Sequence, residues 1–552
     1  MKIDLSKQPF YLSEEQIVWV EETKKNLTIE QKVGQLFICM GQDYDLQELM
    51  NMVTESRVGG ILFRPAPAST IKEWYDVVEK DAPVPLLKAA NLEEGGSGGI
   101  SDGTLFGWPL LVSAANDIHE TEKFAQVCAY EGRRAGINWT YSPVADIDNN
   151  FLNPITNVRS YGSEVQRVMD NTGAYVETIQ KSGMAACAKH FPGDGVDFRD
   201  HHLHPTYNSL SAQEWYETYG AVYKNLIAKD LLSVMVGHIV QPNVAMDMNP
   251  KLHFEDCLPA SLSTELLQGV LREKFNFQGL ITTDATIMGG YCMPMERKKA
   301  LPTSIMAGCD MVVFSTDINE DYNYMLQAIK EGFLTETRLN EAVTRILALK
   351  AKVCNTPENQ KMALEVKNKA KLWHRECADK AITLVKERRK DILPISKEKY
   401  KVVRLITLGK DDILDGSMTE LATEFLEKQG FEVEKYCPME DDLHGTGKLQ
   451  ENRITVYLAN YEQASNQTTV RIQWCPKHAL DIPRFVQEED SLFISFGNPY
   501  LLMDIPRVPV YINAYTATKD TIELALEKIM GNSEFKGVSP VDAFCGLPDT
   551  RL

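Results

Sequence analysis

The sequence lacks long apolar runs and any excess of basic charge. No stretch of 18 or more apolar residues occurs among its 552 residues, and its first residues carry no apolar core of the kind found in secretory signals. Asp and Glu number 77 against 58 Lys and Arg, so the net charge is −19. A field of this sign repels nucleic acid and anionic membrane surfaces, and we expect neither as a partner.

Paired cysteine motifs are also missing. The eleven cysteines are an odd number, lie scattered along the chain and include no CxxC pair. This pattern is typical neither of a disulfide framework nor of a zinc-finger signature, and it suits a reducing compartment. We therefore expect a cytoplasmic protein.

Eight short apolar runs alternate with longer amphipathic segments over the first 320 residues. Continuous apolar runs separated by helical patterns indicate buried parallel strands with crossover helices, and eight such units close a (β/α)₈ barrel. An open doubly wound sheet has the same alternation, so only the count favours the barrel. The runs cover residues 36–40, 60–63, 86–90, 137–141, 185–188, 232–236, 280–283 and 311–314.

The rest of the chain divides into a helical segment and a second α/β alternation. We predict the barrel over residues 1–345, a helical linker over 346–395, and a smaller α/β three-layer sandwich over 396–552. Length supports this division, because 552 residues exceed the usual size of one domain. The predicted strands of the sandwich lie at 402–408, 454–457, 492–496 and 508–512, and its helices at 418–428 and 518–530.

Polar residues follow several of the predicted barrel strands. The carboxyl ends of barrel strands form the face on which such enzymes carry their chemistry, so we expect these side chains at one mouth. They are Asn91, Asp146, Lys189, His190, His238 and Asp284.

One segment concentrates reactive side chains. Residues 189–195 read KHFPGDG and are followed by Asp200, His201 and His202, so that four of the ten histidines, His204 included, lie close together. Its glycines and proline predict a loop. The histidine cluster could be read as a metal site, but no carboxylate or cysteine completes a known ligand spacing, and we expect proton transfer rather than a metal.

Three residues form the candidate catalytic set. Asp284 ends the run 279–283, where a strand would present a carboxylate nucleophile, although an Asp there also suits a helix cap. Imidazole titrates near neutral pH, so His202 is the candidate proton donor. Asp200, two residues earlier, is placed to bond its other ring nitrogen.

Several further residues are candidate sugar contacts. Lys189, His190 and Arg159 offer fixed donors to ring hydroxyls, although Lys and Arg more often lie at the surface or in ion pairs. Met235 lies near the end of a predicted buried strand and His238 follows that strand. A Met at such a position more often packs in the core than contacts a ligand.

These motifs together resemble glycoside hydrolase family 3, and most closely its β-N-acetylglucosaminidase branch. The resemblance rests on KHFPGDG with the later DHH, and on the runs RSYG at 159–162, SPVADI at 142–147, LTIEQKVGQLF at 27–37 and AGCDMV at 307–312. It implies a barrel followed by an α/β sandwich, with no metal and no cofactor. Relatives that act as β-glucosidases generally lack the DxH motif and take their acid from a glutamate of the second domain.

The resemblance also implies roles for individual residues. Asp284 would be the nucleophile, His202 the acid/base and Asp200 its partner, while Arg159, Lys189 and His190 would hold an N-acetylglucosamine ring. The family usually acts on N-acetylglucosamine linked to anhydro-N-acetylmuramic acid during cell-wall recycling, often in the cytoplasm.

Two positions depart from the family pattern. Asn91 to Gly96 stand where the family has DQEGG, so either Asn91 or Glu93 replaces its sugar-binding Asp, and an arginine expected soon afterwards is not evident. Asp194 stands where many members have His.

We accordingly expect a retaining β-N-acetylglucosaminidase. The alternatives are a phosphorylase of the same fold, since a histidine acid/base repels phosphate less than a carboxylate does, a β-glucosidase, and a sugar-binding protein that has lost catalysis. The intact set of Asp200, His202 and Asp284 argues against the last of these.

Overall fold

A computed structural model describes residues 3–354, 356–357, 359–439 and 451–552. Its chain folds into two compact units. The first comprises residues 1–106, 121–153 and 165–370, and the second comprises 107–120, 154–164 and 371–552. Two short internal segments from the first third of the chain therefore belong to the second unit.

The first unit is built around a closed barrel of parallel strands. Neighbouring strands pair in the order β1-β10-β9-β7-β5-β4-β3-β2, and β1 pairs with both β2 and β10. The pairing of the first strand with the last excludes the open doubly wound sheet and confirms the predicted barrel. The strands are β1 (Phe37–Met40), β2 (Gly60–Leu62), β3 (Leu87–Ala90), β4 (Trp139–Thr140), β5 (Ala185–Phe191), β7 (Ser233–Val236), β9 (Leu280–Ala285) and β10 (Met311–Val313).

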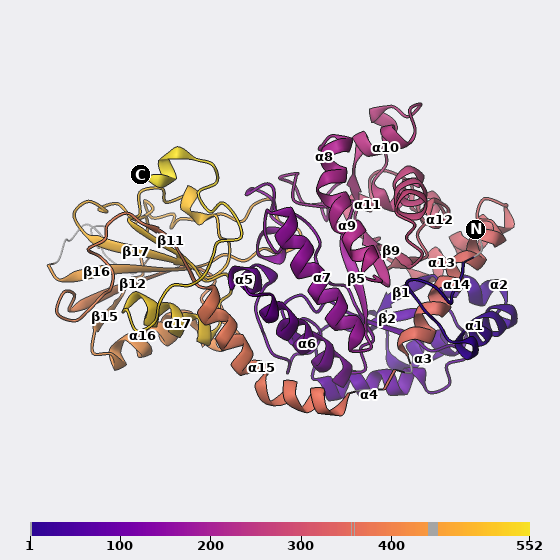
Figure 1. Ribbon diagram of the computed structural model, residues 1–552, viewed down its shortest axis with the longest axis horizontal. Helices are drawn as coiled ribbons and strands as arrows, with labels where there is room; N and C mark the ends of the chain where they lie inside the picture. Colours follow the sequence, from indigo (N-terminus) through magenta and orange to yellow (C-terminus); the bar gives the residue numbers. More distant parts are fainter. Residues whose placement is uncertain (1–2, 355, 358, 440–450) are drawn as a thin grey trace. The chain divides into compact units, whose positions relative to one another are not determined.

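Burial explains why these strands read as continuous apolar runs. Helices surround the barrel in Figure 1, so both strand faces are covered, and β5 is buried at every position. The helices of this part of the chain are α1 (Glu14–Asn26), α2 (Ile29–Gly34), α3 (Leu46–Thr54), α4 (Ala68–Glu79), α6 (Ile118–Arg134), α7 (Val165–Lys181), α8 (Ala212–Glu217), α9 (Tyr219–Ala228), α10 (Pro242–Met248), the π-helical η6 (Glu265–Lys274), α11 (Gly289–Cys292), α12 (Arg297–Ala307), α13 (Ile318–Lys330) and α14 (Glu336–Val353).

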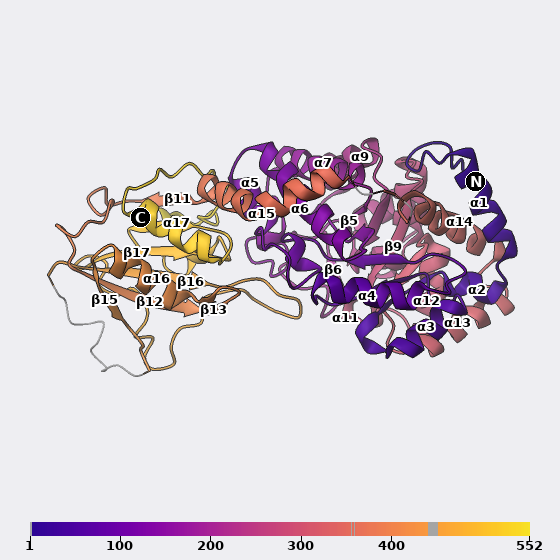
Figure 2. The same ribbon diagram turned by 90° about the horizontal axis from the view of Figure 1, so that it is seen from below.

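The second unit contains a mixed six-stranded sheet. Its order is β11-β18-β17-β16-β12-β15, and every neighbouring pair is parallel except β11 with β18. Helices α16 (Met418–Lys428) and α17 (Lys519–Ile529) lie side by side against the sheet in Figures 1 and 2. The strands are β11 (Thr383–Glu387), β12 (Val402–Gly409), β15 (Glu432–Lys435), β16 (Arg453–Asn460), β17 (Asp490–Ser495) and β18 (Val510–Asn513).

Part of the segment predicted as a helical linker forms a strand. Helix α15 (Gln360–Ala381) occupies much of residues 346–395, but Thr383–Glu387 then forms β11 at the edge of the second sheet. Thr383 and Val385 are β-branched, and the antiparallel partner β18 supplies backbone hydrogen bonds that no local pattern reveals. Strand β15 was likewise not predicted. No helix among the described residues has the length and apolarity needed to cross a membrane.

Candidate active site

Asp284 lies near the carboxyl end of β9, at the barrel mouth. Its Oδ1 accepts a hydrogen bond from the backbone N–H of Ala285 at 2.7 Å. Its Oδ2 faces Nε2 of His201 at 3.7 Å and Nε2 of His190 at 3.9 Å, which are both beyond hydrogen-bonding distance. The side chain keeps 14% of its surface exposed. One oxygen of this carboxylate therefore remains available to a ligand.

The charge state of Asp284 follows from its neighbours. Burial by itself raises the pKa of this carboxyl, but His190 and the other nearby imidazoles outweigh burial and hold the pKa below its ordinary value. Asp284 is thus ionised at neutral pH. An ionised carboxylate at the mouth of a barrel has the charge that a nucleophile requires.

His238, two residues after β7, positions the backbone that follows Asp284. Its Nε2 lies 3.0 Å from the carbonyl oxygen of Ala285, which only accepts, so Nε2 carries the proton. Its Nδ1 lies 2.9 Å from Oγ of Ser261 and accepts from that hydroxyl. Burial lowers the pKa of His238 to about 4, so the ring is neutral and its tautomer is fixed.

His190 is held from behind by a buried carboxylate. Its Nδ1 lies 2.7 Å from Oδ2 of Asp146, and the backbone N–H groups of His190 and Asp194 both donate to Oδ1 of Asp146. Asp146 and His190 are almost fully buried. Because Asp146 fixes Nδ1, the opposite nitrogen Nε2 is directed toward Asp284.

Lys189 contacts both Asn91 and Glu93, the two residues that could replace the family's sugar-binding Asp. Its Nζ lies 2.5 Å from Oε1 of Glu93 and donates to Oδ1 of Asn91 at 3.0 Å. Asn91 follows β3 directly, and it is exposed while Glu93 is buried. The ammonium of Lys189 is therefore shared between the amide oxygen of Asn91 and the carboxylate of Glu93, which neutralises it.

His202 and Asp200 form a close pair. Nδ1 of His202 lies 2.7 Å from Oδ1 of Asp200, and the same oxygen accepts the backbone N–H of His202 at 2.8 Å. Asp200 is buried, whereas 22% of the His202 side chain is exposed. The carboxylate therefore fixes the ring tautomer and leaves Nε2 free to exchange a proton. His202 also packs edge-on against His201, with the ring centroids 5.1 Å apart.

Two further predicted sugar contacts are Arg159 and Met235. Arg159 belongs to the second unit, at the end of η3 (Asn157–Arg159), where its Nη1 donates to the carbonyl of Ile155 at 3.4 Å. Met235 is buried within β7. Their expected contacts with a sugar stay predictions.

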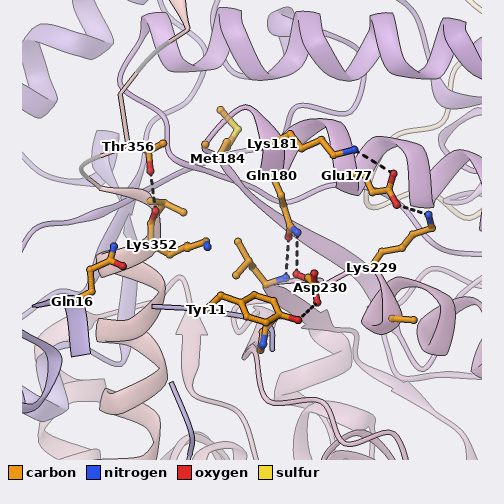
Figure 3. Close-up of a pocket in the computed structure, with 15 residues that line it drawn as sticks. Tyr11, Gln16, Glu177, Gln180, Lys181, Met184, Lys229, Asp230, Lys352 and Thr356 are labelled. Carbon is orange, nitrogen blue, oxygen red and sulfur yellow. Dashed lines mark hydrogen bonds and ion pairs between the residues drawn. The ribbon is translucent and has the colours of Figure 1, made fainter. Parts of the chain in front are cut away.

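A separate pocket lies at the amino ends of the strands. It has a volume of about 600 Å³, and Met184 and Leu232, which directly precede β5 and β7, form part of its lining. Figure 3 shows that its polar groups bond one another: Tyr11 donates to Asp230 and Lys229 pairs with Glu177. Tyr11 with Asp230 and Lys229 with Glu177 thus satisfy one another, whereas the cluster of His190, His201 and Asp284 lies at the opposite end of the strands.

Comparison with known proteins agrees with this geometry. The model of the glycosyl hydrolase family 3 N-terminal domain matches residues 28–349, which is more than half of the chain. The chain belongs to glycosyl hydrolase family 3. It is therefore an enzyme of the glycoside hydrolase class, and the family resemblance of the sequence motifs is confirmed.

Three relatives indicate the range of activities near this family 3 chain. A beta-N-acetylglucosaminidase/beta-glucosidase of Cellulomonas fimi is 38% identical over 564 aligned residues and covers both chains completely. A solved beta-glucoside phosphorylase is 42% identical, with a TM-score of 0.93 and 99% of both chains covered. A family 3 beta-N-acetylglucosaminidase from Paenibacillus shares the fold at 23% identity, with a TM-score of 0.77, and covers 94% of this chain and 100% of its own.

The sequence reasoning did not give His201 and Asp146 a role in this family 3 site. The DxH spacing indicates His202, whereas in the structure His201 and His190 approach Asp284, at 3.7 and 3.9 Å. The sequence predicts Asp146 at the barrel mouth but assigns it no catalytic or binding role. The position of Asp146 after β4 indicates that it lies near the mouth, but its contact with His190 forms only when the two segments come together in the fold.

Proposed function

We propose that this protein is a retaining enzyme that cleaves terminal β-linked N-acetylglucosamine through a covalent glycosyl intermediate. The observation that supports the proposal is that Asp284 is ionised with one open oxygen at the barrel mouth, while the buried Asp200 fixes the ring of the partly exposed His202. Asp284 is the proposed nucleophile, His202 the acid/base, and Asp200 the residue that orients His202.

In the first step, a carboxylate oxygen of Asp284 attacks the anomeric carbon. The bond between this carbon and the leaving oxygen breaks, and Nε2 of His202 gives its proton to that oxygen. The buried Asp200 carboxylate stabilises the ring while it carries the proton. The products are a glycosyl ester on Asp284 and a free aglycone.

In the second step, water attacks the anomeric carbon of the ester. Its proton passes to Nε2 of His202, the bond from carbon to Asp284 breaks, and the carboxylate is restored. The proton taken in this step replaces the one given in the first. The enzyme therefore returns to its starting protonation state.

The sugar ring would be held by donors around the mouth. Lys189, His190 and Asn91 are proposed to bind its hydroxyls, with Arg159 and Met235 as further predicted contacts. The proposal that the natural substrate is a cell-wall muropeptide, and that the enzyme acts on it in the cytoplasm, rests on the family resemblance alone.

Transfer to phosphate is a second candidate, supported by the type of acid/base. Asp200 is fully buried, so the acid/base group that the pair exposes is the imidazole of His202, which repels an anion less than a carboxylate would. The 42% identity to a beta-glucoside phosphorylase supports the same outcome. Phosphate would then replace water in the second step, with a sugar 1-phosphate as product.

The first test uses p-nitrophenyl β-N-acetylglucosaminide and p-nitrophenyl β-glucoside, each with and without phosphate. We expect turnover of the N-acetyl substrate, and its products distinguish free sugar from sugar 1-phosphate. Preference for the glucoside would replace the proposed substrate, and turnover that needs phosphate would favour the second candidate. Absence of activity on both substrates would revive the interpretation as a binding protein.

A second test isolates the acid role of His202. His202→Ala should lose about 10²–10⁴-fold in turnover of a saccharide with a poor leaving group but much less with an activated aryl leaving group, because only the former needs a proton. His204→Ala, in the same loop, is the matched control. Equal losses of His202→Ala on both substrates would argue against proton donation.

A further inference from the structure

Three potential metal-binding atoms converge at the barrel mouth. They are Nε2 of His190, Nε2 of His201 and Oδ2 of Asp284, and all lie within 4.8 Å of one another. The carboxylate oxygen lies 3.7 Å from the His201 nitrogen and 3.9 Å from the His190 nitrogen. Two imidazoles and one carboxylate are a donor set that zinc enzymes use.

The surroundings of His190 match those of a metal-binding histidine. Such a ring usually donates its other N–H to a carboxylate, which fixes the tautomer and the ring orientation. Asp146 supplies this contact at 2.7 Å from Nδ1. The nitrogen that remains, Nε2, is the one directed at Asp284.

His201 is the stronger indication, because its side chain is fully buried and neither ring nitrogen has a hydrogen-bond partner among the described residues. A buried polar group left without a partner destabilises the fold. Its Nδ1 faces Oδ2 of Asp194 at 4.0 Å, and its Nε2 faces Asp284. A ligand between His201 and Asp284 would satisfy Nε2.

We propose that His190, His201 and Asp284 bind a divalent transition-metal ion, with Zn²⁺ as the preferred species, when no sugar occupies the site. Ligands at about 2.1 Å from a tetrahedral ion lie about 3.4 Å apart, so the separations of 3.7 and 3.9 Å from Oδ2 of Asp284 close by a few tenths of an ångström on binding. Water takes the fourth position. The ion occupies the open oxygen of Asp284 and so competes with the sugar.

Metal binding stands independently of the proposed function, whereas competition with the sugar rests on it. The metal therefore acts as an inhibitor that blocks the nucleophile, and it takes no part in the reaction.

Binding is tested on the full-length, metal-free protein by titration with ZnCl₂ in a calorimeter and with CoCl₂ by visible absorption. We expect one ion per chain and a Co²⁺ spectrum typical of four-coordinate geometry. His201→Asn should weaken Zn²⁺ binding by more than about 100-fold, since it removes a ligand. His204→Asn, in the same loop but bonded to the carbonyl of Pro205, should bind like the wild type.

Two further arms keep the proposal falsifiable. Asp284→Ala, at a partly exposed position, should also lose Zn²⁺ binding, and circular dichroism checks that both variants are folded. Undetectable binding by the wild type, or unchanged binding in folded His201→Asn, would overturn the site. Zn²⁺ should raise KM for the p-nitrophenyl substrate without lowering kcat. A protein that binds Zn²⁺ through His201 but cleaves no glycoside would keep the metal site and discard the proposed function.

Discussion

Two aspartates on neighbouring barrel strands have opposite environments. Asp310 directly precedes β10, at its amino end, and Asp284 lies near the carboxyl end of β9, its paired neighbour. Oδ2 of Asp310 accepts from Arg272 at 2.8 Å and from the Ile281 N–H at 3.0 Å. Oδ1 of Asp310 accepts from Arg338 at 2.8 Å.

The comparison separates structural from reactive carboxylates. Arg345 adds a third guanidinium at 3.4 Å from Asp310, so that every oxygen of this carboxylate is bonded and the side chain is fully buried. Asp284 accepts one backbone hydrogen bond and leaves Oδ2 facing two imidazoles at longer range. Both carboxyls have a lowered pKa, but only Asp284 keeps an oxygen for a ligand.

The largest expected effect comes from removing the open carboxylate. Asp284→Asn should lower kcat on the p-nitrophenyl substrate by about 10⁴-fold or more, because no covalent intermediate can form. The free energy of unfolding should change by less than about 1 kcal/mol, since this carboxylate makes few contacts. Activity assays and urea denaturation of the same sample check both parts. Retained turnover would assign the nucleophile elsewhere.

Asp310→Asn should have the reverse effect. It leaves three guanidinium groups buried without a counter-charge, which destabilises the fold by about 3–5 kcal/mol. The midpoint of urea denaturation measures this loss. The folded fraction should keep its kcat, because Asp310 lies at the other end of the barrel. Normal stability of the variant would mean that the arginines are compensated by other groups.

Lys350 on α14 allows a test of how the stability of the barrel's amino end depends on pH. Burial lowers its pKa to about 8 from an ordinary 10.5, and its Nζ lies 2.5 Å from Oε1 of the neutral Gln35. The unfolded chain therefore binds the proton more tightly, so stability should rise between about pH 8 and pH 10.5 by up to about 3 kcal/mol.

Lys350→Met should abolish this rise. Chemical denaturation of wild type and variant at pH 7.5, 9 and 10.5 measures the difference in slope. Parallel slopes in the two proteins would show that Lys350 does not titrate in this range.

The smallest effect is expected at the pocket of Figure 3. Lys229 pairs with Glu177 at 2.5 Å, but about a third of each side chain is exposed, and such pairs contribute about 0–1 kcal/mol. Lys229→Met should leave kcat/KM within about twofold of the wild type. A tenfold change would show that the amino end of the barrel affects the active site, and that the two ends are not separated into structural and reactive parts.

Much of the local structure could be predicted from the sequence. Ser13 with Gln16 and Thr28 with Gln31 have the spacing of a capping box, and the structure forms both pairs of hydrogen bonds where helices α1 and α2 begin. All eight apolar runs became barrel strands. These signals depend on spacing along the chain, and the backbone geometry of each element fixes what the spacing means.

Contacts between distant segments could not be predicted in the same way. The sequence left open whether Asn91 or Glu93 replaces the family's Asp, and the structure brings both to Lys189 from β5. It also marked His202, although His190 and His201 are the rings closest to Asp284. Each of these contacts depends on side-chain directions and strand register that are set only when the barrel closes.

The sequence alone determined the eight barrel strands, the loop that carries Asp200 and His202, and the strand that ends near Asp284, because each is specified by residues close together in the chain. Only the tertiary structure decided that β1 pairs with β10, that Thr383–Glu387 joins the second sheet, and that Asp284 keeps one oxygen open beside His190 and His201. The physical reason is that a short-range pattern fixes which way a backbone runs, whereas hydrogen-bond satisfaction depends on partners brought together by long-range pairing.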